Sequence, residues 1–192
     1  MGKSEPIRNY KDIERMKQYL LAQGRWRDHA LITMGLNTAL RISDLLKLRW
    51  GNVYNFKTST FYLHIYIQEQ KTKKQNIVSI NPCICDSLNL LKSHLPTVSE
   101  EDFLFQSRVN QPRPIHRSRA YAIIREMAEV LDMEGVISCH SLRKSFGYHA
   151  WKRGYSPAVI MEIYNHSSLQ VTRRYLSINQ DDKDQIYMDM SL

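Results

Sequence analysis

One β-hairpin pattern interrupts this 192-residue chain, and the stretches before and after it have the spacing of helices. Residues 61–67 alternate by residue type, and residues 76–80 are again β-rich, with the polar segment 68–75 between them. This pattern predicts an antiparallel hairpin. Its turn is basic, because it holds Lys71, Lys73 and Lys74. A fold for this chain must therefore hold a small sheet among helices.

The helical stretches carry apolar residues at intervals of three and four positions. We expect helices over residues 9–23, 27–40, 117–131 and 140–153, and helices that begin near Asn81, Ser156 and Ser168.

Single residues mark several helix ends. Ser43 is expected to cap a short leucine-bearing helix, which would leave Arg41 at the junction between two helices. Gly154 is expected to terminate the helix before it, and Asn165 is suited to the left-handed turn at a helix end.

The charge of the chain favours polyanionic partners. It has 27 Lys and Arg against 19 Asp and Glu, a formal net charge of +8. The three cysteines lack zinc-type spacing and are expected to be reduced thiols. No run approaches the roughly 20 apolar residues of a membrane span, and no signal-peptide core opens the chain. We therefore expect a cytoplasmic protein without a membrane partner.

Three segments carry the residues of a phosphate-handling site. His140 and Arg143 are three positions apart, so on a helix both project to one side and can meet one phosphate. Downstream, Tyr175 follows His166 by nine residues, and upstream Arg41 sits in the segment Thr-Ala-Leu-Arg-Ile-Ser-Asp. Each segment alone is common, whereas their order and spacing together are specific.

Together these segments resemble the tyrosine recombinase, or phage integrase, family. The family pattern has an Arg in a Thr-Gly-Leu-Arg-Ile-Ser-Glu-like segment, a hairpin Lys, His-x-x-Arg, Gly-His and a Tyr nine residues later. The matching positions here are Arg41, Lys71, His140, Arg143, His166 and Tyr175. The resemblance covers nearly the whole chain and implies an α+β fold, mostly helical, with a small antiparallel sheet that carries Lys71.

The resemblance implies DNA strand cleavage and rejoining through a 3′-phosphotyrosyl bond, with Tyr175 as nucleophile. Arg41 and Arg143 would stabilise charge on the phosphate, and His140 would accept the tyrosine proton. His166 would donate to the phosphate or orient Tyr175, and Lys71 would protonate the leaving 5′-oxygen. Such chemistry needs no cofactor and no metal.

The chain departs from the family pattern at a few positions. Ala39 and Asn165 stand where Gly is usual, and Asn tolerates the same positive φ. Asp44 replaces Glu and is expected to orient Arg41 or cap its helix. Lys73 stands where a turn Gly often sits, so Lys73 or Lys74 could supply the amine instead of Lys71.

The expected organisation is a catalytic domain over 1–180 and a tail over 181–192, which is apolar enough to dock on a neighbouring protomer. The expected partners are double-stranded DNA and further copies of the chain, in a tetramer on paired sites. Two alternatives stay open: DNA relaxation like that of type IB topoisomerases, and a DNA-binding module without catalysis. Tyr121, Tyr148, Tyr155 and Tyr164 are expected to be packing residues.

Overall fold

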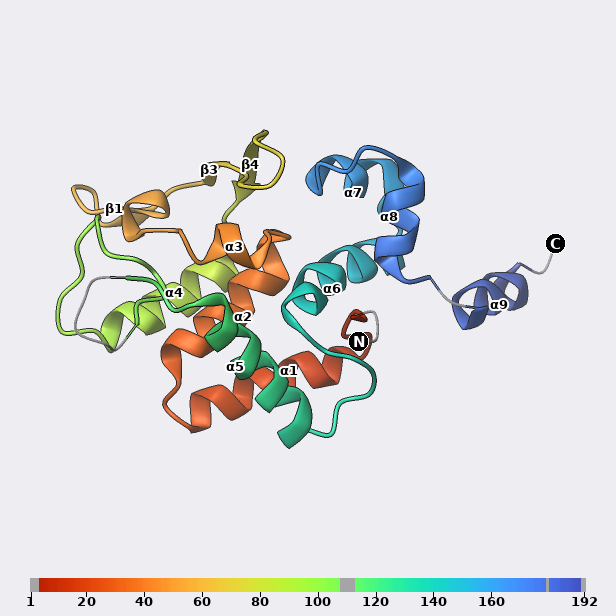
Figure 1. Ribbon diagram of the computed structural model, residues 1–192, viewed down its shortest axis with the longest axis horizontal. Helices are drawn as coiled ribbons and strands as arrows, with labels where there is room; N and C mark the ends of the chain where they lie inside the picture. Colours follow the sequence, from red (N-terminus) through yellow and green to blue (C-terminus); the bar gives the residue numbers. More distant parts are fainter. Residues whose placement is uncertain (1–3, 108–112, 179, 191–192) are drawn as a thin grey trace.

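A computed structural model describes residues 4–107, 113–178 and 180–190 of the chain (Figure 1). Its helices are α1 Tyr10–Ala22, α2 Trp26–Thr38, α3 Ile42–Leu45, α4 Pro82–Ser93, α5 Arg117–Val130, α6 Cys139–Lys152, α7 Pro157–Ile163, α8 Leu169–Leu176 and α9 Gln180–Asp189, with a 3₁₀ turn at Trp50–Asn52. The strands form two antiparallel pairs, β1 Tyr54–Asn55 with β2 Thr60–Phe61 and β3 His64–Gln68 with β4 Gln75–Ser79. The expected α+β, mostly helical fold is confirmed.

Most helix boundaries follow the capping residues of the sequence. The side chains of Asn9, Asn81 and Ser168 each accept a hydrogen bond from a backbone N–H of the first helical turn. The prediction for Ser43 is wrong, because α3 begins at Ile42 and Arg41 is its N-cap residue. Arg41 nevertheless lies between α2 and α3, as expected. Asn165 has φ 53° at the end of α7.

The hairpin is shorter than the alternation suggested. We expected one strand over 61–67, but Phe61 ends β2 and a new strand starts at His64. The chain bends between them because the N–H of Tyr62 bonds to the carbonyl of Val53, while the carbonyl of Leu63 accepts from Ile80. The β3–β4 register runs from His64 opposite Ser79 to Gln68 opposite Gln75.

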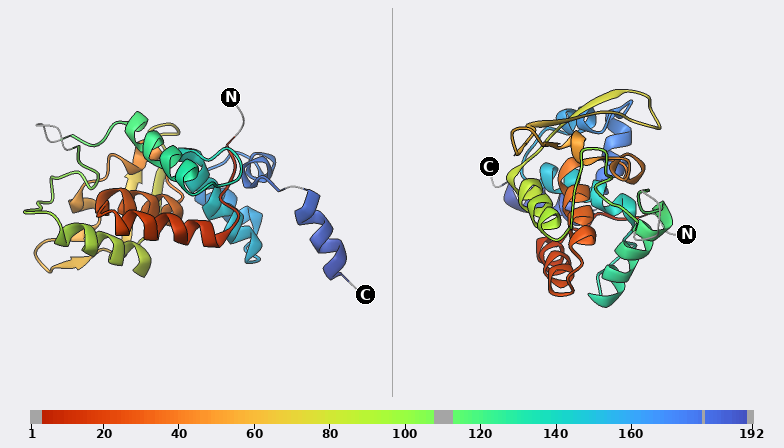
Figure 2. Two further views of the ribbon diagram at one scale, coloured as in Figure 1. Left: turned by 90° about the horizontal axis from the view of Figure 1, so that it is seen from below. Right: turned by 90° about the vertical axis from the view of Figure 1, so that its left-hand side faces the viewer.

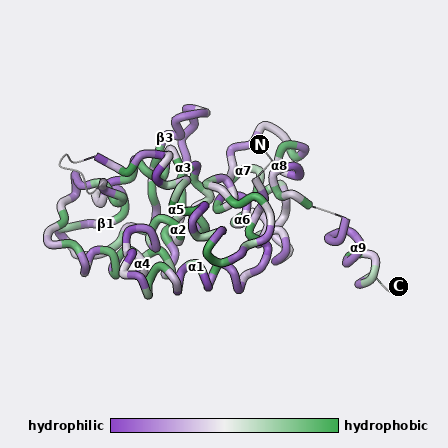
Figure 3. The backbone as a smooth tube through the Cα atoms, turned by 60° about the horizontal axis from the view of Figure 1, so that its bottom comes forward, coloured by the Kyte–Doolittle hydropathy of each residue, from purple (hydrophilic) through white to green (hydrophobic). Residues whose placement is uncertain are grey.

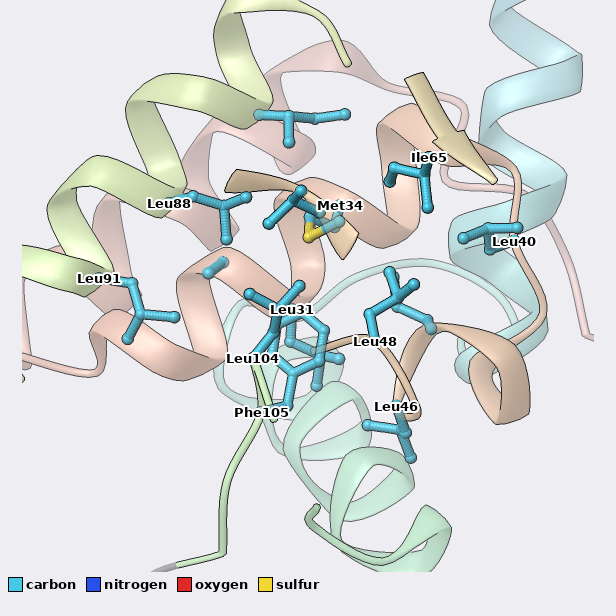
Figure 4. Close-up of a cluster of buried hydrophobic side chains, with 14 of the residues drawn as sticks. Leu31, Met34, Leu40, Leu46, Leu48, Ile65, Leu88, Leu91, Leu104 and Phe105 are labelled. Atoms are coloured by element: carbon cyan, nitrogen blue, oxygen red, sulfur yellow. The ribbon is translucent and has the colours of Figure 1, made fainter. Parts of the chain in front are cut away.

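A large apolar core joins the hairpin to the helices. Its side chains come from α2, α3, α4 and α5, from β3 and β4 and from the segments that connect them, and Figure 4 shows Leu31, Met34, Leu40, Leu46, Leu48, Ile65, Leu88, Leu91, Leu104 and Phe105. Ile65 is fully buried in this core, so the base of the hairpin is fixed. Its hydrophilic tip extends away from the core (Figure 3).

A second cluster packs α1 and α5 on α2 and α6, and a third, smaller one lies between α6, α7 and α8. The third cluster contains Tyr164 and Leu176, with Tyr175 against it. Gly147 of α6 lies here, and a Cβ at this position would be 2.2 Å from the Tyr164 hydroxyl. Only glycine permits this approach of α6 to Tyr164.

The last helix stands apart from the others. In Figures 1 and 2, α9 projects from the body beyond α8. Within the described residues, no helix is long and apolar enough to cross a membrane.

Four tyrosines were expected to pack. Tyr148 and Tyr164 are buried, whereas the expectation is wrong for Tyr121 and Tyr155, which are exposed on helix and loop surfaces.

Candidate active site

Five of the six predicted site residues meet where α2, α6 and α8 converge. Arg41 follows the end of α2, His140 and Arg143 lie in the first turns of α6, His166 lies between α7 and α8, and Tyr175 lies near the end of α8. The sixth, Lys71, lies in the β3–β4 turn on the same side of the molecule as α7 and α8 (Figure 1).

Tyr175 is placed by ring contacts and faces a histidine. Its hydroxyl lies 3.5 Å from Nδ1 of His140, a long hydrogen-bond distance. Its ring centroid is 5.1 Å from that of Tyr164 and 5.0 Å from that of His166, both edge-on. The phenol oxygen is thus beside a possible base while the ring is packed.

Arg143 is the most buried member of the site. Its side chain donates to the carbonyls of Ala39 and Tyr164, so it joins the end of α2 to the end of α7. Ala39 has φ 55°, a left-handed conformation that costs an L-residue roughly 1–2 kcal/mol. The guanidinium lies 4.6 Å from the Tyr164 ring centroid and 5.9 Å from that of Tyr175.

Arg41 pairs with a carboxylate that our sequence analysis did not identify. Its Nη1 lies 2.5 Å from Oε2 of Glu69, whose side chain is 0% exposed. Asp44, expected to orient Arg41, instead accepts the N–H of Gln70 at 3.0 Å through Oδ1. It therefore anchors the hairpin turn. Its other oxygen, Oδ2, is buried and has no hydrogen-bond partner among the described residues.

Lys71, Lys73 and Lys74 are all exposed on the hairpin turn. Lys73 has φ 59°, a left-handed conformation that glycine adopts more readily than other residues. The backbone of the turn therefore has a defined shape, while the amines of the three lysines lie in solvent. The assignment of Lys71 rather than Lys73 or Lys74 stays a prediction.

His140, His166 and Tyr175 have pKa shifts that favour their uncharged forms. Desolvation, helped by Arg117 and Arg143, lowers the pKa of His140, and the same cause with Arg143 and Arg41 lowers the pKa of His166 to about 4. Burial raises the pKa of Tyr175 although Arg143 and Arg41 oppose it. At neutral pH the site thus holds a phenol beside a neutral imidazole.

The low pKa of His166 predicts a pH-dependent stability. In the unfolded chain this group has an ordinary pKa of 6.5, so between pH 6.5 and about 4 the unfolded state binds a proton that the folded state does not. The free energy of unfolding should therefore fall as the pH drops through this window. Urea titrations of the DNA-free protein at pH 7, 6 and 5 measure it. His166→Gln should reduce the slope, and an unchanged slope would contradict the assignment.

Comparison with known proteins decides the family. The sequence matches the phage integrase family over residues 9–182. The chain belongs to the phage integrase family. Of its integrase-family relatives, a "Probable integrase/recombinase YoeC" of Bacillus subtilis (strain 168) is 39% identical over 178 residues, which is 92% of this chain and 91% of that one.

Other integrase-family members are longer. A "Tyrosine recombinase" of Pseudothermotoga lettingae is 27% identical over 191 residues, and the match spans 93% of this chain but 63% of that one. Among solved structures, the XerA recombinase has a TM-score of 0.76 at 19% identity and covers 100% of this chain and 66% of its own. XerH bound to a palindromic difH substrate after cleavage has a TM-score of 0.74 at 17% identity, covering 97% and 53%. These structures share the fold.

The sequence patterns did not identify several residues that build this integrase-family site. Besides Glu69, the hydroxyl of Tyr164 bridges the carbonyl of Arg143 and the N–H of Gly147 at 2.6 and 2.8 Å. Buried Lys144 donates to the carbonyl of Ser4 and the hydroxyl of Ser177 at 2.6 and 3.3 Å. These contacts join segments distant in sequence, so no local pattern marks them.

A further contact joins the segment before α1 to the end of α8. Arg8 donates to the carbonyl of Ser177 at 2.5 Å and pairs with Asp182 at 3.2 Å. Because Ser177 directly follows α8, the segment before α1 helps to fix the end of the helix that carries Tyr175.

Within the described residues, no group of three His, Cys, Asp or Glu side chains has the arrangement of a metal site.

Proposed function

We propose that this chain is a site-specific DNA recombinase that cleaves one strand through a 3′-phosphotyrosyl intermediate and rejoins it to a new partner. The observation that carries the proposal is the Tyr175 hydroxyl beside Nδ1 of His140, 3.5 Å away, in a site bordered by Arg143 and Arg41. A phenol, a neutral base and fixed cations are what attack on a phosphodiester needs.

The reaction balances without a co-reactant. The Tyr175 oxygen forms a bond to phosphorus while its proton passes to His140, and the bond from phosphorus to the 5′-oxygen breaks. Lys71 gives a proton to that oxygen. In the reverse direction a 5′-hydroxyl attacks the phosphotyrosine, so both protons return and the bond energy is kept.

The two arginines would act on the phosphate in different ways. Arg143 is fixed by two backbone carbonyls, so its remaining donors are held in place before DNA arrives, which favours stabilisation of the developing charge. Arg41 is shared with Glu69, and its other donors could reach the same phosphate. His166 is held by Thr172 at 3.0 Å and presents its other nitrogen as a donor or as a support for Tyr175.

The test begins with a library of duplexes that carry randomised sequence, so that the target site need not be chosen in advance. Each duplex has one nick, and the library as a whole places the nick at many positions. Where the protein cleaves one base from a nick, the short fragment diffuses away and the protein stays attached to the DNA. DNA that stays attached after denaturation is purified and sequenced. Enrichment of one sequence family supports a site-specific recombinase, and no covalent DNA supports a DNA-binding module instead.

Relaxation activity is separated by a second assay on the enriched site. A type IB topoisomerase-like enzyme would relax supercoiled plasmids without exchanging partners. A recombinase should join strands between two plasmids that each carry the site. Exchange between plasmids is the result we expect.

Binding should depend strongly on salt. Exposed cations surround the site, namely Lys71, Lys73, Lys74, Arg117, Arg173 and Arg174. Contacts to 6–10 phosphates would lower affinity by roughly 10³ to 10⁵ between about 50 and 200 mM salt. Fluorescence anisotropy with a labelled duplex measures this. An affinity nearly independent of salt would mean that these cations do not face DNA.

We also propose that the tail joins protomers into a tetramer on paired sites. The apolar side chains of Ile186, Tyr187 and Met188 on α9 and of Met190 just after it are exposed. Asp182, by contrast, is buried against Arg8 and Lys152, so it belongs to the domain's own ion pairs. Lys152 also donates to Gln185 at 3.0 Å. Removal of the chain after Gln185 keeps these contacts and therefore tests the apolar end of the tail alone.

Truncation after Gln185 should leave binding to a single site unchanged and abolish assembly on paired sites, as measured by light scattering of protein–DNA complexes. Full assembly of the truncated protein would show that the tail has no such role.

Since the named relatives are bacterial proteins, we place this activity in the cytoplasm, where bacterial DNA lies.

A further inference from the structure

Glu69 connects the hairpin turn to the arginine at the end of α2. It directly follows β3, and its backbone closes the turn twice, by donating to the carbonyl of Lys74 and by accepting from the N–H of Lys73, both at 2.9 Å. Its side chain points away from solvent with 0% exposure and reaches Arg41. A fully buried carboxylate beside a phosphate site repels the substrate, so its presence calls for a function there.

The carboxylate of Glu69 accepts hydrogen bonds from side chains on separate parts of the chain. Oε2 accepts from Nη1 of Arg41 at 2.5 Å and from the hydroxyl of Thr72 at 2.6 Å, and Oε1 accepts from Asn76 at 3.3 Å. Burial alone would raise the pKa of Glu69, but the bonds from Thr72 and Arg41 outweigh it and lower the pKa. Glu69 is therefore ionised when it holds these partners.

The two neighbours of Lys71 in the sequence are both anchored. Gln70 donates from its backbone to Asp44 at 3.0 Å and from its side chain to the carbonyl of Ser43 at 2.8 Å. Thr72 donates to Glu69. The exposed Lys71 side chain thus leaves a backbone segment that is fixed to α3 on one side and to the Arg41–Glu69 pair on the other.

We propose that Glu69, acting through Thr72, is a positioning residue that holds the Lys71 turn in register with Arg41. When Arg41 binds a phosphate, the backbone of the turn is then already at a fixed distance from that phosphate. The Lys71 amine needs only a change of side-chain conformation to reach the 5′-oxygen. This inference rests on the proposed function and on Lys71 as proton donor.

The test uses a substrate with sulfur in place of the bridging 5′-oxygen. A thiolate leaves without a proton, so this substrate repairs defects in proton donation but not defects in the base or the phosphate contacts. Thr72→Val removes the hydroxyl that joins the turn to Glu69 and keeps the side-chain shape. Thr72→Ser keeps the hydroxyl. Thr60→Val makes the same substitution in the β1–β2 hairpin, where the hydroxyl of Thr60 lies 2.8 Å from that of exposed Thr58.

On the oxygen substrate, Thr72→Val should cleave about 10-fold more slowly or worse, within the roughly 10² to 10⁴ that general acid catalysis contributes. On the sulfur substrate it should return to near the wild-type rate. Glu69→Gln, which also disturbs Arg41, should be slower on oxygen and only partly restored by sulfur. Thr72→Ser and Thr60→Val should match wild type on both substrates.

Two results would overturn the inference. One is a Thr72→Val protein that is equally slow on both substrates, which would mean that the Glu69 bonds serve the fold or the phosphate contacts. The other is a Thr72→Val protein as fast as wild type on oxygen. If wild type itself forms no adduct, the proposed function fails instead. If wild type cleaves but Lys71→Ala gains nothing from sulfur, cleavage stands and this inference falls with the role of Lys71.

Discussion

Tyr175→Phe should bind the target duplex with unchanged affinity and form no covalent adduct. The substitution removes only the attacking oxygen, because the ring keeps its edge contacts with Tyr164 and His166. Loss of a nucleophile lowers the rate by on the order of 10⁴-fold or more. Anisotropy measures binding, and a denaturing gel after incubation with the nicked substrate measures the adduct.

The matched control for Tyr175→Phe is Tyr155→Phe. Tyr155 is 61% exposed between α6 and α7 and makes no part of the proposed site. This control should form adduct at the wild-type rate. An adduct in Tyr175→Phe would show that another side chain attacks the phosphate, and an adduct lost in both proteins would point to a general effect of the substitution.

Lys71→Ala should slow cleavage of an ordinary phosphodiester by roughly 10² to 10⁴ and leave DNA binding nearly intact. An alkoxide that leaves without a proton is a very poor leaving group, whereas a thiolate leaves readily. The defect should therefore disappear on the 5′-bridging phosphorothiolate. Single-turnover cleavage rates on the two substrates give the comparison.

His140→Ala is the reference that sulfur should not restore. The variant lacks a base rather than an acid, so sulfur at the leaving position does not replace what it has lost. Lys73→Ala and Lys74→Ala test the register of the turn. If sulfur restores one of them and not Lys71→Ala, the proton comes from that lysine; if it restores none of the three, the hairpin does not supply the proton.

The sequence predicted local features of this fold well because single residues determine them. Asn9, Asn81 and Ser168 cap helices through bonds that span only two or three residues, and Asn165 takes the positive φ that its side chain tolerates. The motif spacing also brought His140, Arg143, His166 and Tyr175 together, since consecutive helices hold them. These contacts depend on short stretches of chain.

The features that the sequence did not reveal depend on long-range contacts. The expected strand over 61–67 is divided because Tyr62 donates to the carbonyl of Val53 while Leu63 accepts from the N–H of Ile80. Arg143, which we expected to meet a phosphate, is almost fully buried because the ends of α2 and α7 present carbonyls to it. Glu69 in a basic turn has the pattern of a solvated charge, and only the position of Arg41 makes it a buried partner.

The most direct test of the nucleophile is to identify which side chain is joined to the DNA in the adduct, and through which phosphate. Trypsin cleaves after Arg174 and Lys183, which releases a peptide whose one tyrosine is Tyr175. After nuclease digestion of the adduct, mass spectrometry should find this peptide carrying a nucleotide through its 3′-phosphate. A nucleotide on any other peptide, or one attached through a 5′-phosphate, would contradict the account of this site.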